Sequence, residues 1–245
     1  MIKEAGFSGV QDGDAQLCTN NGLRITAQHR VNKIGDLDQK IIEWKSSLMD
    51  CATVHVGWGM EDDDEANRLV EYVLSTSEKN DFPIYIETHR ATITQDIWRT
   101  VQIVKRFPEV RFNGDFSHWY TGLEMVNGDF DEKLSFIEPV LSRVRFMHGR
   151  IGNPGCIQVS IDRSDKSPYV EHFKEMWKRS FKGFLTSAVP GDFLCFTPEL
   201  LSPEYYYAQV VNESGRVFEK NDRWTQALLL CEIARECWEE VTIGK

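Results

Sequence analysis

The sequence lacks the features that mark membrane and secreted proteins. No apolar run approaches the roughly 18 residues that a membrane-spanning helix needs, so no membrane partner is expected. The first residues, Met1-Ile2-Lys3-Glu4-Ala5-Gly6, contain no apolar stretch of the kind found in a signal peptide. The expected location is therefore cytoplasmic.

Paired cysteines, glycine-rich loops and an excess of positive charge are lacking too. None of the six cysteines forms a Cys-x-x-Cys pair, which argues against a zinc knuckle or a thioredoxin motif. A chain of 245 residues needs no disulfides to fold, so a reducing compartment fits. The net charge of −10 repels phosphate backbones and disfavours nucleic acid as a partner. No glycine-rich phosphate loop is apparent, which slightly disfavours a phosphosugar.

What the chain does contain is a regular alternation of short apolar β-type runs and amphipathic helical stretches. Strands are expected near residues 7, 25, 54, 84, 111, 145 and 194. Helices are expected at 35–49, 61–79, 94–106, 130–142, 167–186 and 221–240, with an acidic start at 61–64 and Thr94 as a cap. Residues 152–170 and 202–220 resemble loops. The alternation predicts right-handed βαβ units around a parallel sheet, in a single domain spanning 1–245.

Seven strands are one fewer than the eight that close a parallel barrel. The segment 2–7 resembles a helix end with a C-cap glycine that leads into the strand near residue 7. We therefore expect an α/β fold, a (β/α)8 TIM barrel that lacks its first strand in this chain. An incompletely closed barrel exposes part of its core, so a homo-oligomer or another chain that covers the gap is also expected.

Four of the predicted strands are followed by a side chain that binds metal ions well. These side chains are Glu87, Asp115, His148 and Glu199, separated by 28, 33 and 51 residues. Because a parallel barrel carries its active site at the carboxyl ends of its strands, all four are expected on one face. Three carboxylates and an imidazole suit a divalent metal ion such as Mn²⁺, Zn²⁺, Mg²⁺ or Co²⁺. The sequence thus predicts one shared metal site.

The same residues suggest proton-transfer chemistry on a sugar. A metal ion that holds two neighbouring sugar oxygens makes the adjacent C–H or O–H more acidic. Glu87 and Glu199 are the candidates for taking and returning that proton. His118, three residues after Asp115, is expected to position a hydroxyl, and Arg150 to place positive charge near an enediolate or a carboxylate.

Other side chains near strand ends could either contact substrate or pack in the core. His55, His89 and Trp58 are expected to contact substrate, although a histidine in a strand is commonly part of a satisfied core. Trp58, Trp119 and Phe116 could stack on a sugar face or cover the top of the barrel. His172 lies within a charged helical stretch and is expected at the surface. The run at 205–207 is expected to pack, or to close over a ligand.

These segments resemble the xylose isomerase-like TIM barrels, which include sugar isomerases, sugar and sugar-phosphate epimerases, inosose dehydratases and endonuclease IV. The resemblance covers nearly the whole chain apart from the first strand. Ile86-Glu87-Thr88-His89 looks like the glutamate motif after the family's fifth strand, and Asp115-Phe116-Ser117-His118 like its Asp-x-x-His after the sixth. His148 and Glu199 match the ligands after the seventh and eighth.

The resemblance implies a metal-dependent sugar isomerase or epimerase, with the two glutamates handling the proton and with His118 and Arg150 contacting the substrate. The same four ligands also serve dehydratases of cyclitols or keto-sugars, and a non-catalytic sugar-binding barrel would keep this fold. Endonuclease IV has an additional Asp-x-His pair after its seventh strand, which the stretch 149–156 lacks. His29 and His55 do lie where that nuclease has further ligands. The missing pair and the negative charge argue against an abasic-site endonuclease.

Overall fold

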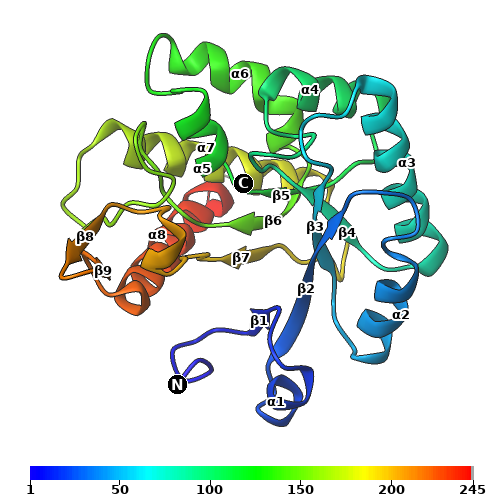
Figure 1. Ribbon diagram of the computed structural model, residues 1–245, viewed down its shortest axis with the longest axis horizontal. Coiled ribbons are helices and arrows are strands. Elements are labelled where there is room, and N and C mark those ends of the chain that lie inside the picture. Colours follow the sequence, from blue (N-terminus) through cyan, green and yellow to red (C-terminus); the bar gives the residue numbers. More distant parts are fainter. Residues whose placement is uncertain (244–245) are drawn as a thin grey trace.

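Seven strands form one parallel sheet in which each strand hydrogen-bonds to the next along the chain (Figure 1). They are β1 (Gly9–Gln11), β2 (Arg24–Val31), β3 (Ala52–Val56), β4 (Ile84–Glu87), β5 (Phe112–Gly114), β6 (Val144–His148) and β7 (Cys195–Thr197). The helices are α1 (Ala15–Asn20), α2 (Asp38–Ser46), α3 (Asp63–Asn80), α4 (Ile97–Arg106), α5 (Ser117–Gly122), α6 (Phe130–Leu141), α7 (Pro168–Ser187) and α8 (Arg223–Ile243). The computed structural model describes residues 1–243. The predicted parallel α/β barrel and its seven strands are confirmed.

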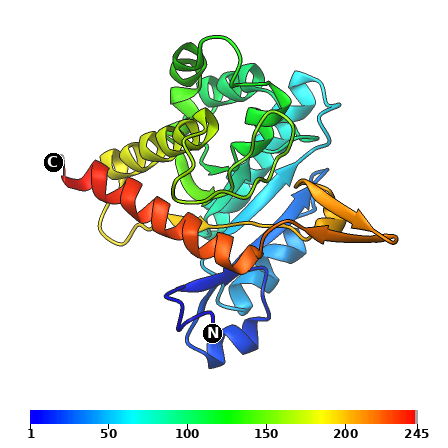
Figure 2. The same cartoon turned by 90° about the vertical axis from the view of Figure 1, so that its left-hand side faces the viewer.

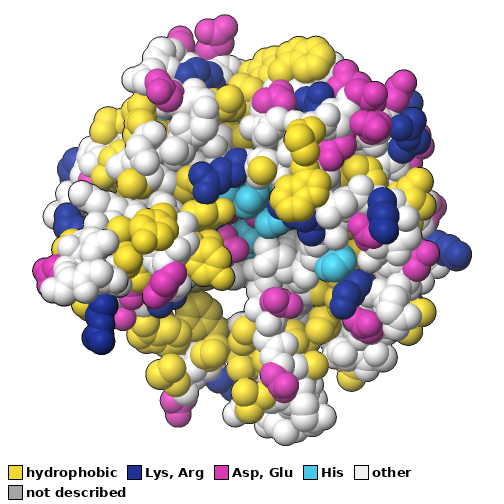
Figure 3. Space-filling view, viewed as in Figure 1, with side chains coloured by type: hydrophobic (Ala, Val, Ile, Leu, Met, Phe, Trp, Pro, Cys, Tyr) yellow, Lys and Arg dark blue, Asp and Glu magenta, His cyan; other side chains and the backbone are white. Residues whose placement is uncertain are grey.

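The sheet curves almost into a barrel but is open between its first and last strands. Among the described residues, β1 pairs only with β2, and β7 pairs only with β6. A cavity of about 1080 Å³ lies along the opening, between the β1 region and the strand β7 with the helix α8. The opening is visible as a notch in the surface (Figure 3). Gln11 and Glu199 both line it, so it reaches the carboxyl ends of the strands.

A large apolar core between the sheet and the surrounding helices holds the strands in place. Val54 and Ile86 of the sheet belong to the same buried cluster as Val70 of α3 and Val104 of α4. Trp177 of α7 is buried in this cluster as well. Each large apolar side chain buried in this way contributes roughly 1.5–3 kcal/mol to folding. The buried core thus fixes the positions of the strand ends.

Side-chain caps determine where two of the helices begin. Asp62 caps α3 and forms a capping box with Glu65, so the acidic run serves the start of the helix as predicted. The helix α4 begins at Ile97 because Asp96, and not Thr94, accepts the capping hydrogen bond. The Thr94 hydroxyl instead donates to the backbone oxygen of Glu87 at 2.6 Å, which braces the end of β4.

Two short helices and one β-hairpin were not predicted from the sequence. The helices α1 and α5 have only six residues each, too short to show a helical period. Within the predicted loop 202–220, β8 (Val210–Glu213) and β9 (Arg216–Glu219) form an antiparallel hairpin that projects from the barrel (Figure 2). Ser214 and Gly215 join the two strands with positive φ angles of 52° and 77°, as a tight hairpin turn requires.

None of the described helices is long and apolar enough to cross a membrane.

Strand alternation brings polar side chains to the mouth of the barrel, above an apolar floor. Cys51, Tyr85 and Phe146 form a buried cluster inside the barrel, with Cys195 packed against it. Successive side chains of a strand point to opposite faces, so residues two positions apart point the same way. The residue two positions after each of these inward side chains therefore also points inward, nearer the carboxyl end. Phe146 is thus followed by His148, and Tyr85 by Glu87.

Candidate metal centre

The four side chains predicted to bind a metal converge at the carboxyl ends of β4 to β7. Glu87 ends β4, Asp115 follows β5, His148 ends β6, and Glu199 lies two residues after β7. Nδ1 of His148 lies 3.5 Å from Oε2 of Glu87, 3.7 Å from Oδ2 of Asp115 and 3.6 Å from Oε2 of Glu199. Only Glu199 is partly exposed, at 20% of its side chain. One nitrogen thus faces three carboxylate oxygens at nearly equal distances.

A glutamine from the first strand fixes the orientation of the His148 ring. The Gln11 amide donates to Oγ1 of Thr53 at 2.9 Å, which turns its oxygen toward Nε2 of His148, also at 2.9 Å. Nε2–H therefore donates to Gln11, and Nδ1 is the ring nitrogen that faces the carboxylates. The sequence analysis missed this residue, although Gln11 is the polar residue that ends the first predicted strand.

Asn113 and Ser117 hold two of the carboxylates in place. The Asn113 side chain donates to Oε2 of Glu87 at 2.9 Å. The Ser117 hydroxyl and backbone N–H donate to Oδ1 of Asp115 at 2.5 and 3.2 Å. Both donors are fully buried, and neither was singled out from the sequence. Asn113 is detectable in hindsight as a polar residue inside an apolar strand next to Gly114-Asp115.

Arg150 lies against two of the predicted metal ligands. Its Nη2 contacts Oδ2 of Asp115 and lies 3.0 Å from Oε2 of Glu199. Nε donates to the Ser117 hydroxyl at 3.1 Å, while Nη2 lies 3.3 Å from Nε2 of His118. Arg150 therefore brings a buried positive charge into the site. The sequence analysis expected this charge near an enediolate or a carboxylate, and in the structure it lies against the carboxylates of Asp115 and Glu199.

Three imidazoles form a row beside this cluster. The ring centroids of His55 and His89 are 4.1 Å apart, and those of His89 and His118 are 3.8 Å apart. Nε2 of His55 lies 3.0 Å from Oε1 of Glu87, the oxygen that faces away from His148. Oδ2 of Asp115 lies 3.5 Å from Nε2 of His118. The row places three further imidazoles beside the four predicted ligands.

Charge interactions keep the carboxylates ionised despite their burial. Burial by itself would raise the pKa of Glu87, but the neighbouring charge of His148 outweighs it and holds this pKa well below the usual value. Burial also opposes ionisation of Asp115, and the Arg150 charge lowers its pKa well below normal. For His148, the charges of Glu199 and Glu87 overcome burial and raise the pKa well above that of free imidazole. Burial lowers the pKa of His89 to about 3.

The cluster contains buried polar atoms that the protein leaves without hydrogen bonds. Oδ1 of Asn113, Nδ1 of His118 and Nη1 of Arg150 have no hydrogen-bond partner, and Nε2 of His55 and Oε1 of Glu87 face only each other, at 3.0 Å. Buried polar atoms are normally satisfied, so an unpaired group of them at one place indicates a missing ligand. Groups with ligand atoms within 4.8 Å of one another include Asp115, His148 and Glu199, as well as Glu87, Asp115 and His118. A divalent cation fits these donor atoms, which include two ionised carboxylates and imidazole nitrogens.

Aromatic and basic side chains surround the mouth. Trp58 is 49% exposed, and the guanidinium of Arg30 lies over its ring at 4.0 Å. The Tyr207 ring lies 4.6 Å from Arg90 and 5.3 Å from Arg150. Histidine and acidic side chains gather in a hollow at the centre of this face (Figure 3). An exposed aromatic ring beside such a hollow can stack on a sugar ring.

Several candidates lie away from the mouth. Trp119 is buried and donates to the Thr94 backbone oxygen at 2.7 Å, and Phe116 is buried in the core, so both pack the barrel. His29 packs edge-on against Trp44, at 6.2 Å between ring centroids, and belongs to none of the groups of possible metal ligands among the described residues. Tyr205 and Tyr206 of the 205–207 run are exposed.

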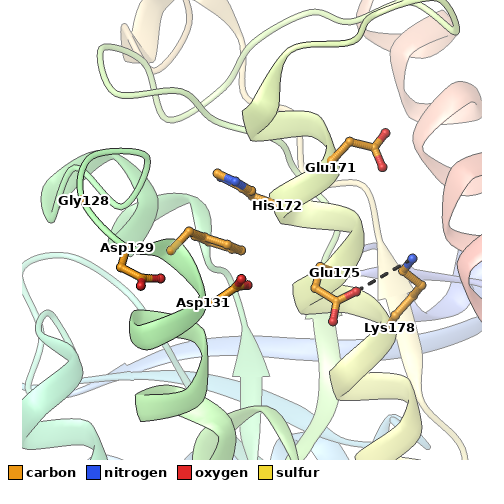
Figure 4. A pocket seen from close by; sticks show the side chains of 8 residues that line it. Gly128, Asp129, Asp131, Glu171, His172, Glu175 and Lys178 are labelled. Atoms are coloured by element: carbon orange, nitrogen blue, oxygen red, sulfur yellow. Dashed lines mark ion pairs between the residues drawn. The ribbon is translucent and has the colours of Figure 1, made fainter.

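His172 is partly exposed at the surface, as expected, but its ring also packs against neighbouring side chains. Its ring stacks on Phe130 at 3.7 Å, and its Nδ1 lies 2.8 Å from the Tyr120 hydroxyl. The stack joins α6 to α7 at the edge of a shallow acidic pocket lined by Asp129, Asp131 and other charged residues (Figure 4). His172 therefore serves helix packing in the outer layer of the barrel.

Comparison with known proteins identifies the fold. No family profile and no curated protein matches the sequence significantly. A xylose isomerase-like TIM barrel protein from Mycobacterium smegmatis in complex with magnesium is similar in structure at 12% identity, with a TM-score of 0.58 over 98% of this chain and 87% of that one. A sugar phosphate isomerase/epimerase from Parabacteroides distasonis is similar at 13% identity, with a TM-score of 0.53 over 97% and 85%.

A third similar structure is endonuclease IV from Thermus thermophilus, at 14% identity and a TM-score of 0.52, covering 98% of this chain and 92% of that one. The three neighbours thus match this chain over almost its full described length. They include sugar-processing enzymes and a nuclease on the same scaffold. The chain therefore has the fold of the xylose isomerase-like TIM barrels.

Proposed function

We propose that this protein is a metal-dependent isomerase or epimerase that moves a proton next to the carbonyl group of a sugar or sugar derivative. The observation that supports this most strongly is the convergence of Glu87, Asp115, His148 and Glu199 on one point at the carboxyl ends of the strands. These four residues would hold a divalent cation. When bound, the cation would supply electrophilic polarisation of the substrate oxygens.

Glu87 and Glu199 would exchange the proton with the substrate. They come from β4 and from the segment after β7, so their carboxylates approach the site from strands that are not neighbours. Glu87 is buried with Oε1 facing Nε2 of His55 at 3.0 Å, while Glu199 is partly exposed beside the opening of the barrel. A carboxylate on each side of a substrate can remove a proton from one face and return it to the same or the other face.

Arg150 and His118 would orient the substrate and stabilise negative charge on it. Arg150 keeps Nη1 unpaired, and His118 keeps Nδ1 unpaired, although both side chains are almost completely buried. A fixed guanidinium in a site that excludes water stabilises an enediolate more strongly than it would in bulk water. His55, His89 and Trp58 complete the substrate side of the site in this proposal.

Solvent isotope exchange tests the reaction class. The protein is incubated in deuterated water with Mn²⁺ and a panel of ketoses and aldoses, and products are followed by NMR. Proton transfer predicts deuterium at the carbon next to the carbonyl, together with isomer or epimer. Loss of water from a cyclitol or keto-sugar would instead identify a dehydratase. A folded protein that turns over none of these sugars with any divalent metal would contradict the proposal.

The row of imidazoles favours a second candidate, the metal-assisted hydrolysis of a phosphodiester. His55, Glu87 and His89 form a further group of possible metal ligands, which shares Glu87 with the first cluster. Two or more ions at such spacing suit phosphodiester cleavage, and one structural neighbour is an endonuclease IV. Incubation with duplex DNA containing an abasic site and Zn²⁺ distinguishes the two. Nicking would favour the nuclease, whereas intact DNA with sugar turnover would exclude it.

A further inference from the structure

A second cavity lies at the amino-terminal ends of the strands, away from the candidate metal centre. It has a volume of about 860 Å³ and lies between the start of β5 and β6 and the helices α6, α7 and α8. Arg145 near the start of β6 lines this cavity, while His148 at its end belongs to the metal centre. Because strand side chains alternate, these two residues point to opposite faces of the sheet. The cavity is therefore distinct from the proposed active site.

Three arginines line one wall of the cavity and bind only neutral oxygen atoms. Nη1 of Arg111 donates to the backbone oxygens at positions 108 and 110. Arg143 donates to the backbone oxygens at 108 and 139, at 3.1 and 2.8 Å. Arg145 donates to the backbone oxygen at 144 and to the Ser187 hydroxyl, at 2.9 and 2.6 Å. These bonds hold the guanidinium groups in place without neutralising them.

No carboxylate forms an ion pair with these three arginines among residues 1–243. The acidic residues that line the same cavity already have partners: Glu138 and Glu175 pair with Arg179, and Glu240 pairs with Lys178. Lys182, exposed at the rim, adds a fourth positive charge without an ion pair in the described structure.

The arginines act on one another as like charges. Burial lowers the pKa of Arg111, and the charge of Arg143 lowers it further. Burial likewise lowers the pKa of Arg145, with the charge of Arg111 as the next cause. The charge of Glu109 partly offsets this for Arg111, and the charges of Tyr85 and Asp192 partly offset it for Arg145. In a chain with a net charge of −10, a half-buried group of arginines without ion pairs favours the binding of an anion.

We propose that this cavity binds a small molecule through a phosphate group. Planar guanidinium groups match the oxygens of phosphate in pairs of hydrogen bonds, and three of them with one lysine suit a doubly charged group better than a single carboxylate. A volume of about 860 Å³ suits a small molecule. The acidic surface of the rest of the chain disfavours a nucleic acid as the source of that phosphate.

Calorimetric titration of the metal-depleted protein with pyrophosphate, and separately with inorganic phosphate, tests the site. The wild-type protein is expected to bind pyrophosphate, and Arg111→Gln and Arg143→Gln to bind it at least about tenfold more weakly, since each removes charge-assisted hydrogen bonds. Arg68→Gln is the matched control, because Arg68 is exposed on α3 and lies outside the cavity. Its affinity for pyrophosphate is expected to equal that of the wild type.

Lys182→Gln keeps the test decisive if the arginine variants fail to fold. This exposed residue can be changed without disturbing the core, and the change is expected to weaken pyrophosphate binding and to reduce its dependence on salt. The proposal is overturned if the folded wild type binds neither probe. It is also overturned if the folded cavity variants bind pyrophosphate as tightly as Arg68→Gln does.

Discussion

At the scale of single residues, the hydrogen-bond partners of His148 determine which of its nitrogens can bind a cation. Gln11 accepts from Nε2, and three carboxylate oxygens surround Nδ1. The sequence singled out the four candidate ligands because each follows an apolar strand. It did not reveal Gln11, because that residue comes from the far end of the chain and contacts His148 only once the sheet has curved.

Replacing Gln11 with leucine is expected to weaken metal binding. The substitution removes the acceptor that selects the His148 tautomer, and changes of this kind typically cost about 10–100-fold in metal affinity. Calorimetric titration with Mn²⁺ measures the effect. The control is Gln16→Leu, which alters an exposed glutamine of α1. Equal affinity in the two variants would contradict the assigned role of Gln11.

The two proposed proton-transfer glutamates are expected to differ in their effect on stability. Glu87→Gln and Glu199→Gln should each reduce kcat by about 10²-fold or more, since each removes a general acid or base. Carboxylates at the mouth of a barrel seldom belong to its packing. Glu87 differs, because it is 1% exposed and hydrogen-bonded by Asn113.

Thermal melts of the metal-free variants check this difference. Glu87→Gln should lower the Tm by more than Glu199→Gln, because Glu87 is buried and hydrogen-bonded by Asn113, whereas Glu199 is 20% exposed. Glu204→Gln, an exposed glutamate near the same loop, is the control for the loss of one charge. An unchanged Tm in Glu87→Gln would show that this buried carboxylate contributes nothing to the fold.

At the scale of elements, one glutamine joins the two loops beside the mouth of the barrel. The Gln158 side chain donates to the backbone oxygen of Leu201 at 3.1 Å and accepts from its N–H at 2.8 Å. The backbone N–H of Gln158 also donates to the oxygen of Tyr207. These three hydrogen bonds, the Gln158 clamp, hold Tyr207 beside Arg150 and fix the segment that leads to β8.

Replacing Gln158 with alanine is expected to loosen this segment. The change leaves the N–H and C=O of Leu201 without their partner, at a cost of about 1–3 kcal/mol if they stay buried. Limited proteolysis should cut within 200–210 faster than in the wild type, and KM for the sugar should rise more than kcat falls. Gln39→Ala, at an exposed site on α2, serves as the control. Unchanged cleavage would argue against the clamp.

The sequence predicted the strands of the parallel sheet and the long helices well, but not the short helices or the exposed hairpin. The six long helices from α2 to α8 and the seven strands were found because apolar residues recur along each of them. The β8–β9 hairpin was missed because Val211 and Phe218 lie on a largely exposed ribbon. Ser214-Gly215 is the turn signal that could have revealed it.

At the scale of the whole molecule, the barrel presents two faces with different chemistry. The carboxyl ends of the strands gather acidic and imidazole side chains, and the amino-terminal ends gather arginines. The sequence analysis described only the first face, because the arginines at 111, 143 and 145 lie at strand starts, where no catalytic motif is expected. Their proximity follows from the barrel and not from their spacing.

Metal binding should stabilise the whole fold. A ligand at 100 times its Kd adds about 2.7 kcal/mol to the free energy of unfolding. For a domain of this size, that raises the Tm by roughly 5–10 °C. Adding Mn²⁺ to the metal-depleted protein should produce this shift, a chelator should reverse it, and Asp115→Asn should abolish it. A shift that persists in Asp115→Asn would place the ion elsewhere.

The proposed metal centre is tested most directly by an anomalous difference map from crystals grown with Mn²⁺. We expect a strong peak within bonding distance of Glu87, Asp115, His148 and Glu199, with Nδ1 of His148 as the nitrogen ligand. An empty map at this position, with Arg150 remaining between Asp115 and Glu199, would contradict a metal site there.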